Sequence, residues 1–335
     1  MIRSWIKSGA AHVMSRTGLA KLAGSLSGAR RGPLVIGYHR VVEDFGQSSK
    51  TSIPSQLVSL RMLEQHLDWI GRRFRFVSLD EVGARLDGTD GREDPVAAIT
   101  FDDGYRDFYD HALPLLKRKG IPAAVFVVTD LVGTRRVQAH DKLYLLLARR
   151  YQATRAMIEG STQAELEEII RKLEAEAPIP EDTFQSFYSL TWEMLDEIRR
   201  AGITIGSHTR THVLMTKESK RRVTEEAAGS RMEIERRLGT SVRHFAYPSG
   251  VFDTAAVDAV AAAGYRFAYT TCTHRDAQFP QLTAPRTLLW ENSCSDSHGR
   301  FSGSILSCHV HHAFDLMSRC RQRHAAGQES EHGRL

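Results

Sequence analysis

Apolar and polar residues alternate along the chain in two patterns, one of short apolar runs and one of helical period. Between residues 105 and 270 a unit recurs four times: a helix-like segment ends in a basic residue or alanine, a glycine follows, and an apolar run comes next. These runs cover residues 123–128, 203–207, 242–247 and 267–270. Glycine after a helix supplies a left-handed cap, and helices that alternate with buried strands indicate right-handed βαβ units on a parallel sheet. The pattern predicts an α/β fold.

The segment before this repeat predicts two more buried strands, over residues 34–38 and 96–101. Between them the pattern predicts a helix over residues 56–74, a short strand at 76–77 and a small helix over 80–86. The polar, glycine-containing stretch 87–94 is expected to be an exposed loop.

Three segments depart from the repeat. Residues 132–188 are charged and helix-like, so we expect a helical insertion that either shapes substrate access or only packs. Residues 1–31 lack acidic side chains and carry a weak apolar helical face. We expect this segment to be a poorly ordered extension or a helix that caps the barrel floor. The alternative is that residues 1–14 lie on an anionic membrane surface. Residues 316–335 are polar and expected to be disordered, which leaves residues 32–315 for the main domain.

Composition narrows the class of protein. The 335 residues, with 41% hydrophobic content, suffice for one barrel-sized domain. The formal charge of +5 is spread along the chain and does not indicate a nucleic-acid partner. The four cysteines lack Cys-x-x-Cys spacing, which argues against a thiolate zinc site and, without a recognisable signal peptide or membrane span, favours a reducing compartment. We therefore expect a cytoplasmic protein, with the inner membrane face as a further place where it could act.

Two adjacent carboxylates, Asp102 and Asp103, end the predicted strand over residues 96–101. Neighbouring carboxylates repel each other unless a cation separates their roles, so one can bind a metal while the other moves protons. An ordinary Asp-Asp-Gly turn is the alternative. His208 and His212 follow another predicted strand, and histidines four apart would share one face if that segment turns helically, as a Zn²⁺ site requires.

The third element is the turn after the strand over residues 242–247, Tyr247, Pro248, Ser249 and Gly250. Taken in this order, Thr-Phe-Asp-Asp-Gly, His-x-x-x-His and Tyr-Pro-x-Gly closely resemble the polysaccharide deacetylases of carbohydrate esterase family four. The resemblance spans roughly residues 34–290. It implies a distorted (β/α) barrel, in which Asp102 is the general base and Asp103, His208 and His212 bind the metal. It also implies that a backbone N–H of the 247–250 turn meets the oxyanion.

Several of these residues, with His39, fall just past predicted strand ends, at the rim where parallel barrels keep their chemistry. A closed barrel therefore explains their positions better than a doubly wound open sheet. The family's usual Leu-x-His motif is absent, because the residue two positions after Leu306 is Cys308 and not histidine. The segment around His39 instead resembles the permuted branch typified by poly-N-acetylglucosamine deacetylases. We therefore assign His39 as the general acid, and the cluster at His309, His311 and His312 is the alternative.

The third motif also departs from the family, since Ala246 stands where an arginine is common. Arg286, at the start of the last strand-like run, is our candidate for orienting Asp102, with a surface ion pair as its alternative. The resulting hypothesis is a metal-dependent N-deacetylase, in which metal-activated water attacks the acetamide of an N-acetylhexosamine unit in a glycan or lipid-linked saccharide. A carbohydrate-binding relative without catalysis and an O-acetyl esterase are the alternatives. Zn²⁺ is the expected metal, and two His with one Asp also suit Co²⁺ or Ni²⁺.

Overall fold

A computed structural model of the chain describes residues 32–314 except Glu93 and Thr273, together with Ala11, Met14 and Thr17. The predictions for the N-terminal extension and for the tail 316–335 fall almost wholly outside these residues. Within the described part, nine strands form one sheet in which every pairing is parallel. Its strands are β1 Leu34–Tyr38, β4 Arg75–Phe76, β5 Val96–Phe101, β6 Ala123–Val127, β7 Thr204–Ser207, β8 His244–Ala246, β9 Phe267–Thr270, β10 Ala284–Pro285 and β11 Thr287–Leu288.

The sheet is nearly closed into a barrel by one short segment near the end of the domain. The strand order is β10-β9-β8-β7-β6-β5-β1-β11, and β10 and β11 are separated in sequence by Arg286 alone. The segment pairs with β9 on one side, where Arg286 N–H donates to Thr270 O at 2.8 Å. On the other side it pairs with β1, where Leu289 N–H donates to Gly37 O at 2.9 Å. The (β/α) barrel expected from the sequence is confirmed, and the open-sheet alternative is wrong.

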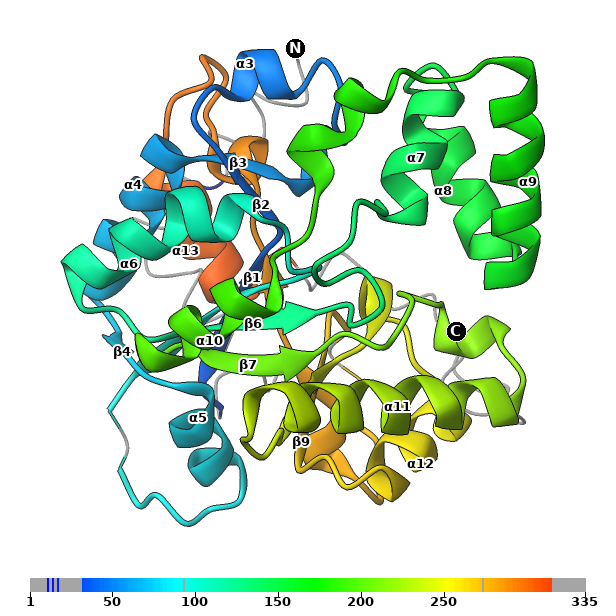
Figure 1. The fold of residues 1–335 in the computed structure, drawn as a ribbon. Coiled ribbons are helices and arrows are strands. Elements are labelled where there is room, and N and C mark those ends of the chain that lie inside the picture. Colours follow the sequence, from blue (N-terminus) through cyan, green and yellow to red (C-terminus); the bar gives the residue numbers. More distant parts are fainter. Residues whose placement is uncertain are drawn as a thin grey trace, which may run out of the picture.

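Helices surround this sheet (Figure 1). The structure places α4, α6 and α13 on one side of the strands and α11 and α12 on another. Their bounds are α4 Leu60–Gly71, α5 Leu79–Leu86, α6 Leu113–Lys119, α10 Trp192–Arg200, α11 Lys220–Leu238, α12 Thr254–Ala262 and α13 Gly303–Val310. A small two-stranded sheet, β2 Arg40–Val42 with β3 Leu57–Ser59, and the short helix α3 Phe45–Ser48 lie beyond the end of β1.

The barrel interior is filled by a separate apolar cluster. Small residues on several strands, among them Ala98, Ala124 and Ala246, leave room for Phe126 and Tyr269, whose ring centroids lie 5.7 Å apart. Helix α5 closes the floor of the barrel through Leu79 and Val82. It packs closely because Gly83 has no side chain: a Cβ there would lie 2.4 Å from the ring of Phe267. The end of the barrel opposite this floor is left for the polar residues that follow the strands.

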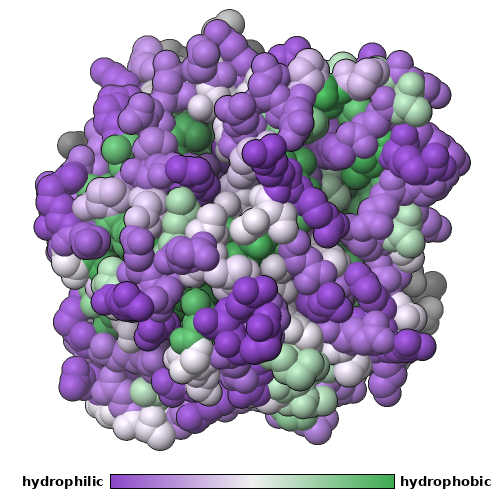
Figure 2. Space-filling model, viewed as in Figure 1, coloured by the Kyte–Doolittle hydropathy of each residue, from purple (hydrophilic) through white to green (hydrophobic). Residues whose placement is uncertain are grey.

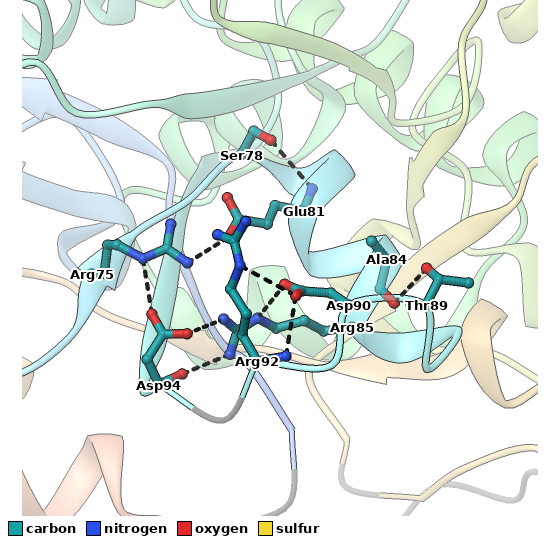
Figure 3. A network of polar contacts seen from close by, with 9 residues as sticks. All are labelled: Arg75, Ser78, Glu81, Ala84, Arg85, Thr89, Asp90, Arg92 and Asp94. Carbon is teal, nitrogen blue, oxygen red and sulfur yellow. Dashed lines mark hydrogen bonds and ion pairs between the residues drawn. The ribbon is translucent and has the colours of Figure 1, made fainter.

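Ion pairs hold the loop between α5 and β5 against the floor (Figure 3). Arg75 binds Asp94 at 2.8 Å and Glu81 at 2.5 Å, and Arg85 binds Asp90 at 3.1 Å. Arg85 also contacts the carboxylate of Asp94. The loop is largely exposed as predicted, and the two pairs of Arg75 face solvent, so they contribute little to stability, whereas Arg85 is mostly buried. Because β5 runs from this loop to the two adjacent aspartates, the network lies far from the candidate site.

The expected helical insertion is present as three helices and a 3₁₀ turn, α7 Ala139–Leu146, α8 Tyr151–Gly160, α9 Gln163–Glu176 and η4 Glu181–Phe187. The helices gather at one side of the molecule (Figure 1) around a small core of their own that includes Leu143, Leu166 and Ile170. Figure 2 shows a largely hydrophilic face, with hydrophobic residues visible among these helices.

Some predicted bounds were wrong. The helix expected over residues 56–74 begins only at Leu60, because Ser59 caps it by accepting a hydrogen bond from Met62 N–H, and the residues before it form β3. In the described part of the chain, no helix is both long and apolar enough to cross a lipid bilayer.

Candidate active site

The two aspartates stand at the rim, directly after β5. Asp102 N–H donates to Tyr38 O at 2.9 Å, which continues the pairing of β5 with β1 beyond Phe101. Asp103 then turns the chain with φ 69°, and Gly104 follows with φ 67°. A left-handed conformation is unusual for aspartate, and such strain is concentrated at functional sites. The turn sends the two neighbouring carboxylates in different directions.

Arg286 clamps Asp102. Its Nη1 and Nη2 donate to the two carboxylate oxygens at 2.7 Å each, and Nη1 also donates to Thr100 Oγ1 at 3.0 Å. Both residues are 4% exposed. Burial opposes ionisation of Asp102, but the charge of Arg286 and its hydrogen bonds outweigh it, so the pKa of Asp102 lies below its usual range. The structure thus brings together the pair that sequence reasoning proposed, although Arg286 lies inside the closing segment and not at the start of a strand.

Asp103 lies against His208 and His212. Its Oδ1 is 3.5 Å from His208 Nε2 and 3.1 Å from His212 Nε2, and the three potential ligand atoms lie within 4.8 Å of one another. His208 Nδ1–H donates to Ala246 O at 2.7 Å, which leaves Nε2 unprotonated toward Asp103. Burial lowers the pKa of His208 to about 4, so the ring is neutral near pH 7.

The donor set fits a divalent cation. Asp103 is 1% exposed, yet neither of its carboxylate oxygens accepts a hydrogen bond of normal geometry from a described residue. A buried carboxylate without donors is costly, and a cation between its oxygen and two imidazole nitrogens removes that cost. Burial opposes protonation of His212, yet Asp103 raises the pKa of His212 above its usual value.

The two histidines are brought together by a turn, not by a helix as the spacing suggested. Thr209 and His212 both have left-handed backbones, with φ of 68° and 63°, and His212 N–H donates to Thr209 Oγ1 at 2.9 Å. Left-handed residues end a helical path, so the expectation of one helical face is wrong. The turn still directs both rings toward Asp103, because it bends the chain back over the end of β7.

Glu226 of α11 holds this turn, and sequence reasoning missed it. The carboxylate is fully buried and accepts hydrogen bonds from Arg210 N–H at 2.7 Å, Thr211 N–H at 2.9 Å and the Thr211 hydroxyl at 2.8 Å. Arg222 pairs with it at 2.8 Å. A signal was present in the sequence, because Glu226 lies on the face of α11 that buries apolar and small side chains, including Val223, Ala227, Ser230 and Ile234.

The turn at residues 247–250 offers one backbone donor. Tyr247 N–H donates to Tyr269 O at 3.0 Å and Gly250 N–H donates to Tyr247 O at 2.8 Å, while Pro248 has no N–H. Ser249 is exposed, with φ 56°, and its N–H has no described backbone acceptor. The side chain of Tyr247 is fully buried against aromatic neighbours and is not available at the rim.

His39 follows β1 and is half-buried at the same rim. Its charge is among the causes that lower the pKa values of Asp102 and Asp103, after burial and the nearer partners, so it lies within electrostatic range of both aspartates. His309 lies instead on α13, where Nε2 donates to Ser293 O at 3.1 Å. Of the two candidate acids, the structure places His39 beside the aspartates.

Comparisons with known proteins agree with this arrangement. The family model described as polysaccharide deacetylase matches residues 89–268, which is more than half of the chain. YxkH of Bacillus subtilis (strain 168), whose name places it among the polysaccharide deacetylases, is 21% identical over 215 residues. That match covers 64% of this chain and 58% of the relative, so the chain spans less than two thirds of that protein's length.

Solved structures share the fold. The deacetylase PplD of Streptococcus pyogenes, solved in complex with acetate, is 20% identical with a TM-score of 0.58, covering 83% of this chain and 97% of that one. IcaB from Ammonifex degensii is 21% identical with a TM-score of 0.57, covering 84% and 97%. A de-N-acetylase from Aggregatibacter actinomycetemcomitans is 20% identical with a TM-score of 0.51, covering 76% and 93%. At these identities the likeness establishes a common barrel architecture.

Proposed function

The chain belongs to the polysaccharide deacetylase family, and from this premise we propose that it is a hydrolase removing N-acetyl groups from N-acetylhexosamine units of a polysaccharide or lipid-linked saccharide. One observation carries the proposal. An ionised Asp102, clamped by Arg286, stands beside a buried Asp103 whose oxygens lack hydrogen-bond donors among the described residues. Adjacent carboxylates in such different surroundings are suited to different tasks.

We assign Asp103, His208 and His212 as ligands of a divalent cation, with Zn²⁺ as the first choice and Co²⁺ or Ni²⁺ compatible with the same donors. Such a cation polarises water and the acetyl carbonyl group, which an acetamide needs because it is a poor electrophile. Asp103 supplies the negative charge of the site. His208 is held for this task by its hydrogen bond to Ala246 O, which fixes both its tautomer and the orientation of its ring.

Asp102 acts as general base in this proposal. Arg286 occupies one lone pair on each carboxylate oxygen, and an ionised carboxylate offers about four acceptor sites, so sites remain for the proton of an attacking water. The lowered pKa of Asp102 keeps it ionised at neutral pH. Arg286 also fixes the plane of the carboxylate, which positions the base before the substrate arrives.

Charge on the tetrahedral oxyanion is met by the Ser249 N–H, the one backbone donor of the 247–250 turn that is not already engaged in the described structure. His39 donates the proton that the departing amine needs. The choice is supported by its charge being among those that lower the pKa values of both aspartates, and general acid catalysis requires a donor within reach of the leaving nitrogen.

The test is acetate release from N-acetylglucosamine oligomers by the metal-loaded protein. We expect acetate and free amine in equal amounts, loss of both after chelation, and recovery on adding Zn²⁺ or Co²⁺. The Asp102→Asn variant controls for background hydrolysis. If the metal-loaded protein binds the oligomer and releases no acetate, it is a binding protein and the proposal fails. If acetate comes only from O-acetylated sugars, the N-acetyl specificity is wrong.

A further inference from the structure

The first helix of the insertion reaches the candidate metal cluster. His140 and Asp141 lie at the start of α7 and are 7% and 0% exposed. The Nε2 atom of His140 lies 4.0 Å from Asp103 Oδ2, and its ring centroid lies 5.2 Å from that of His212. No motif used above includes this histidine, because it belongs to a segment outside the barrel repeat.

A chain of hydrogen bonds fixes the side chain of His140. The Tyr105 hydroxyl lies 2.5 Å from Asp141 Oδ2 and 3.0 Å from His140 Nε2. The Tyr105 hydroxyl donates its one hydrogen to the Asp141 carboxylate. The hydroxyl oxygen can then only accept from His140, so the proton of His140 lies on Nε2.

Gln56 is consistent with this tautomer. Its side-chain amide lies 3.1 Å from His140 Nε2, while its Oε1 has no partner among the described residues. The oxygen and nitrogen of an amide are interchangeable in assignment, and exchanging them directs Oε1 at the imidazole N–H. With that orientation Gln56 also accepts from His140, so its contact is compatible with a proton at Nε2.

Contacts also fix the C-terminal end of the insertion, where the chain returns to the barrel. Arg40, the residue after His39, pairs with Asp107 at 2.8 Å and donates to the backbone oxygen of Ser186. Its guanidinium lies over the rings of Tyr105 and Phe187 at 5.0 and 4.6 Å. Residues next to the barrel motifs thus anchor both ends of the insertion. This double anchoring keeps α7 in a fixed place beside Asp103.

His140 is not placed as a fourth ligand. The group of mutually close ligand atoms contains Asp103, His208 and His212 alone among the described residues, and the proton on Nε2 occupies the atom that faces Asp103. What the site lacks is a donor for Asp103 Oδ2, since a carboxylate that binds a metal through one oxygen is ordinarily hydrogen-bonded through the other. In this structure the Nε2–H of His140 is directed at the Tyr105 oxygen, 3.0 Å away, and Asp103 Oδ2 lies 4.0 Å from the same nitrogen. A shift of about 1 Å redirects this N–H from Tyr105 to Asp103 Oδ2 at hydrogen-bond distance.

We propose that His140 is a positioning residue for Asp103. Its proton, fixed on Nε2 by Tyr105 and Asp141, is donated to Oδ2 when Oδ1 binds the cation, so the inserted helices are part of the metal centre and not only a neighbouring lobe. The inference rests on the proposed role of Asp103 as a metal ligand. It identifies a residue that acts through Asp103 and does not touch the substrate.

The test measures metal binding and not turnover. Zn²⁺ dissociation constants are obtained by chelator competition for the full chain and for His140→Phe, His140→Gln and Lys142→Gln. We expect His140→Phe to weaken binding by about 10- to 100-fold, the usual effect of removing such a partner, and His140→Gln to recover most of it because its amide can donate. Lys142→Gln is the matched control, since Lys142 lies on the same helix but pairs with Glu174 of α9.

The visible absorption of the Co²⁺-loaded proteins provides a second readout, because it reports ligand geometry and would not respond to a merely structural role. Tyr105→Phe preserves shape but removes the hydroxyl that aims His140, so it should alter this spectrum and weaken binding less than His140→Phe does. It also tests the proposal if His140→Phe does not fold. Unchanged Zn²⁺ affinity and an unchanged spectrum in the folded variants would overturn the role of His140 and leave the metal site standing. Absence of metal binding by the unmodified chain would overturn both.

Discussion

Glu226→Ala should destabilise the protein strongly, although Glu226 lies on a helix that is mostly charged. The substitution leaves the N–H groups of Arg210 and Thr211, which donate at 2.7 and 2.9 Å, without their acceptor. Hydrogen bonds to a charged group contribute about 1.5–3 kcal/mol each. Both donors are only partly buried, and water can reach them in part, so we expect a loss of about 3 kcal/mol in the free energy of unfolding.

Urea denaturation of the metal-free protein measures this loss. Glu225→Ala is a matched control, because Glu225 is the preceding residue, is exposed and forms only an i,i+4 pair with Arg221. That pair is worth about 0.3–0.5 kcal/mol. Since Glu226 also shapes the turn that carries His208 and His212, its loss should weaken Zn²⁺ binding, whereas Glu225→Ala should not. If the two variants are equally stable, the turn that carries His208 and His212 does not depend on Glu226, and our account of Glu226 is wrong.

Two further predictions concern the residues around Asp102. Arg286→Met removes the charge that keeps the pKa of Asp102 low, so this pKa rises. Because the base must be ionised, the acidic limb of the kcat/KM profile should move to higher pH, and an unmoved limb would show that Arg286 does not tune the base. His39→Ala should lower turnover by about 10²- to 10⁴-fold with metal retained, as loss of a general acid does, while His309→Ala should change it little. The reverse result would return the acid to the C-terminal cluster.

Much of the fold was predictable because its signals are local. The strand over residues 34–38 was placed at its observed bounds, and glycine caps after helices marked where later strands begin. Asp102 and Asp103 could be placed at a rim because parallel strands deliver their carboxyl ends to one edge. The closing segment was harder to define. It pairs two residues with each neighbour, and Pro285 within it cannot donate, so Arg286 appeared to start a strand when it lies between two short ones.

The surroundings of the site depended on tertiary contacts. The spacing of His208 and His212 suggests a helix, but the left-handed backbones of Thr209 and His212 make a turn whose stability comes from distant Glu226. His140 gives no local signal, because its meaning depends on where the insertion docks. The roles assigned to Asp102, His39 and the proposed ligands remain predictions, although the structure brings these residues together.

Metal content and turnover of Asp102→Asn and Asp103→Asn, measured side by side, test the central claim most directly. Asp103→Asn removes a charged ligand, so bound Zn²⁺ should be largely lost together with acetate release. Asp102→Asn should retain Zn²⁺ at the level of the unmodified chain, because Asp102 is bound by Arg286 and not by the cluster, yet lose nearly all turnover. An equal fall in metal content in both variants would contradict the division of roles between the two aspartates.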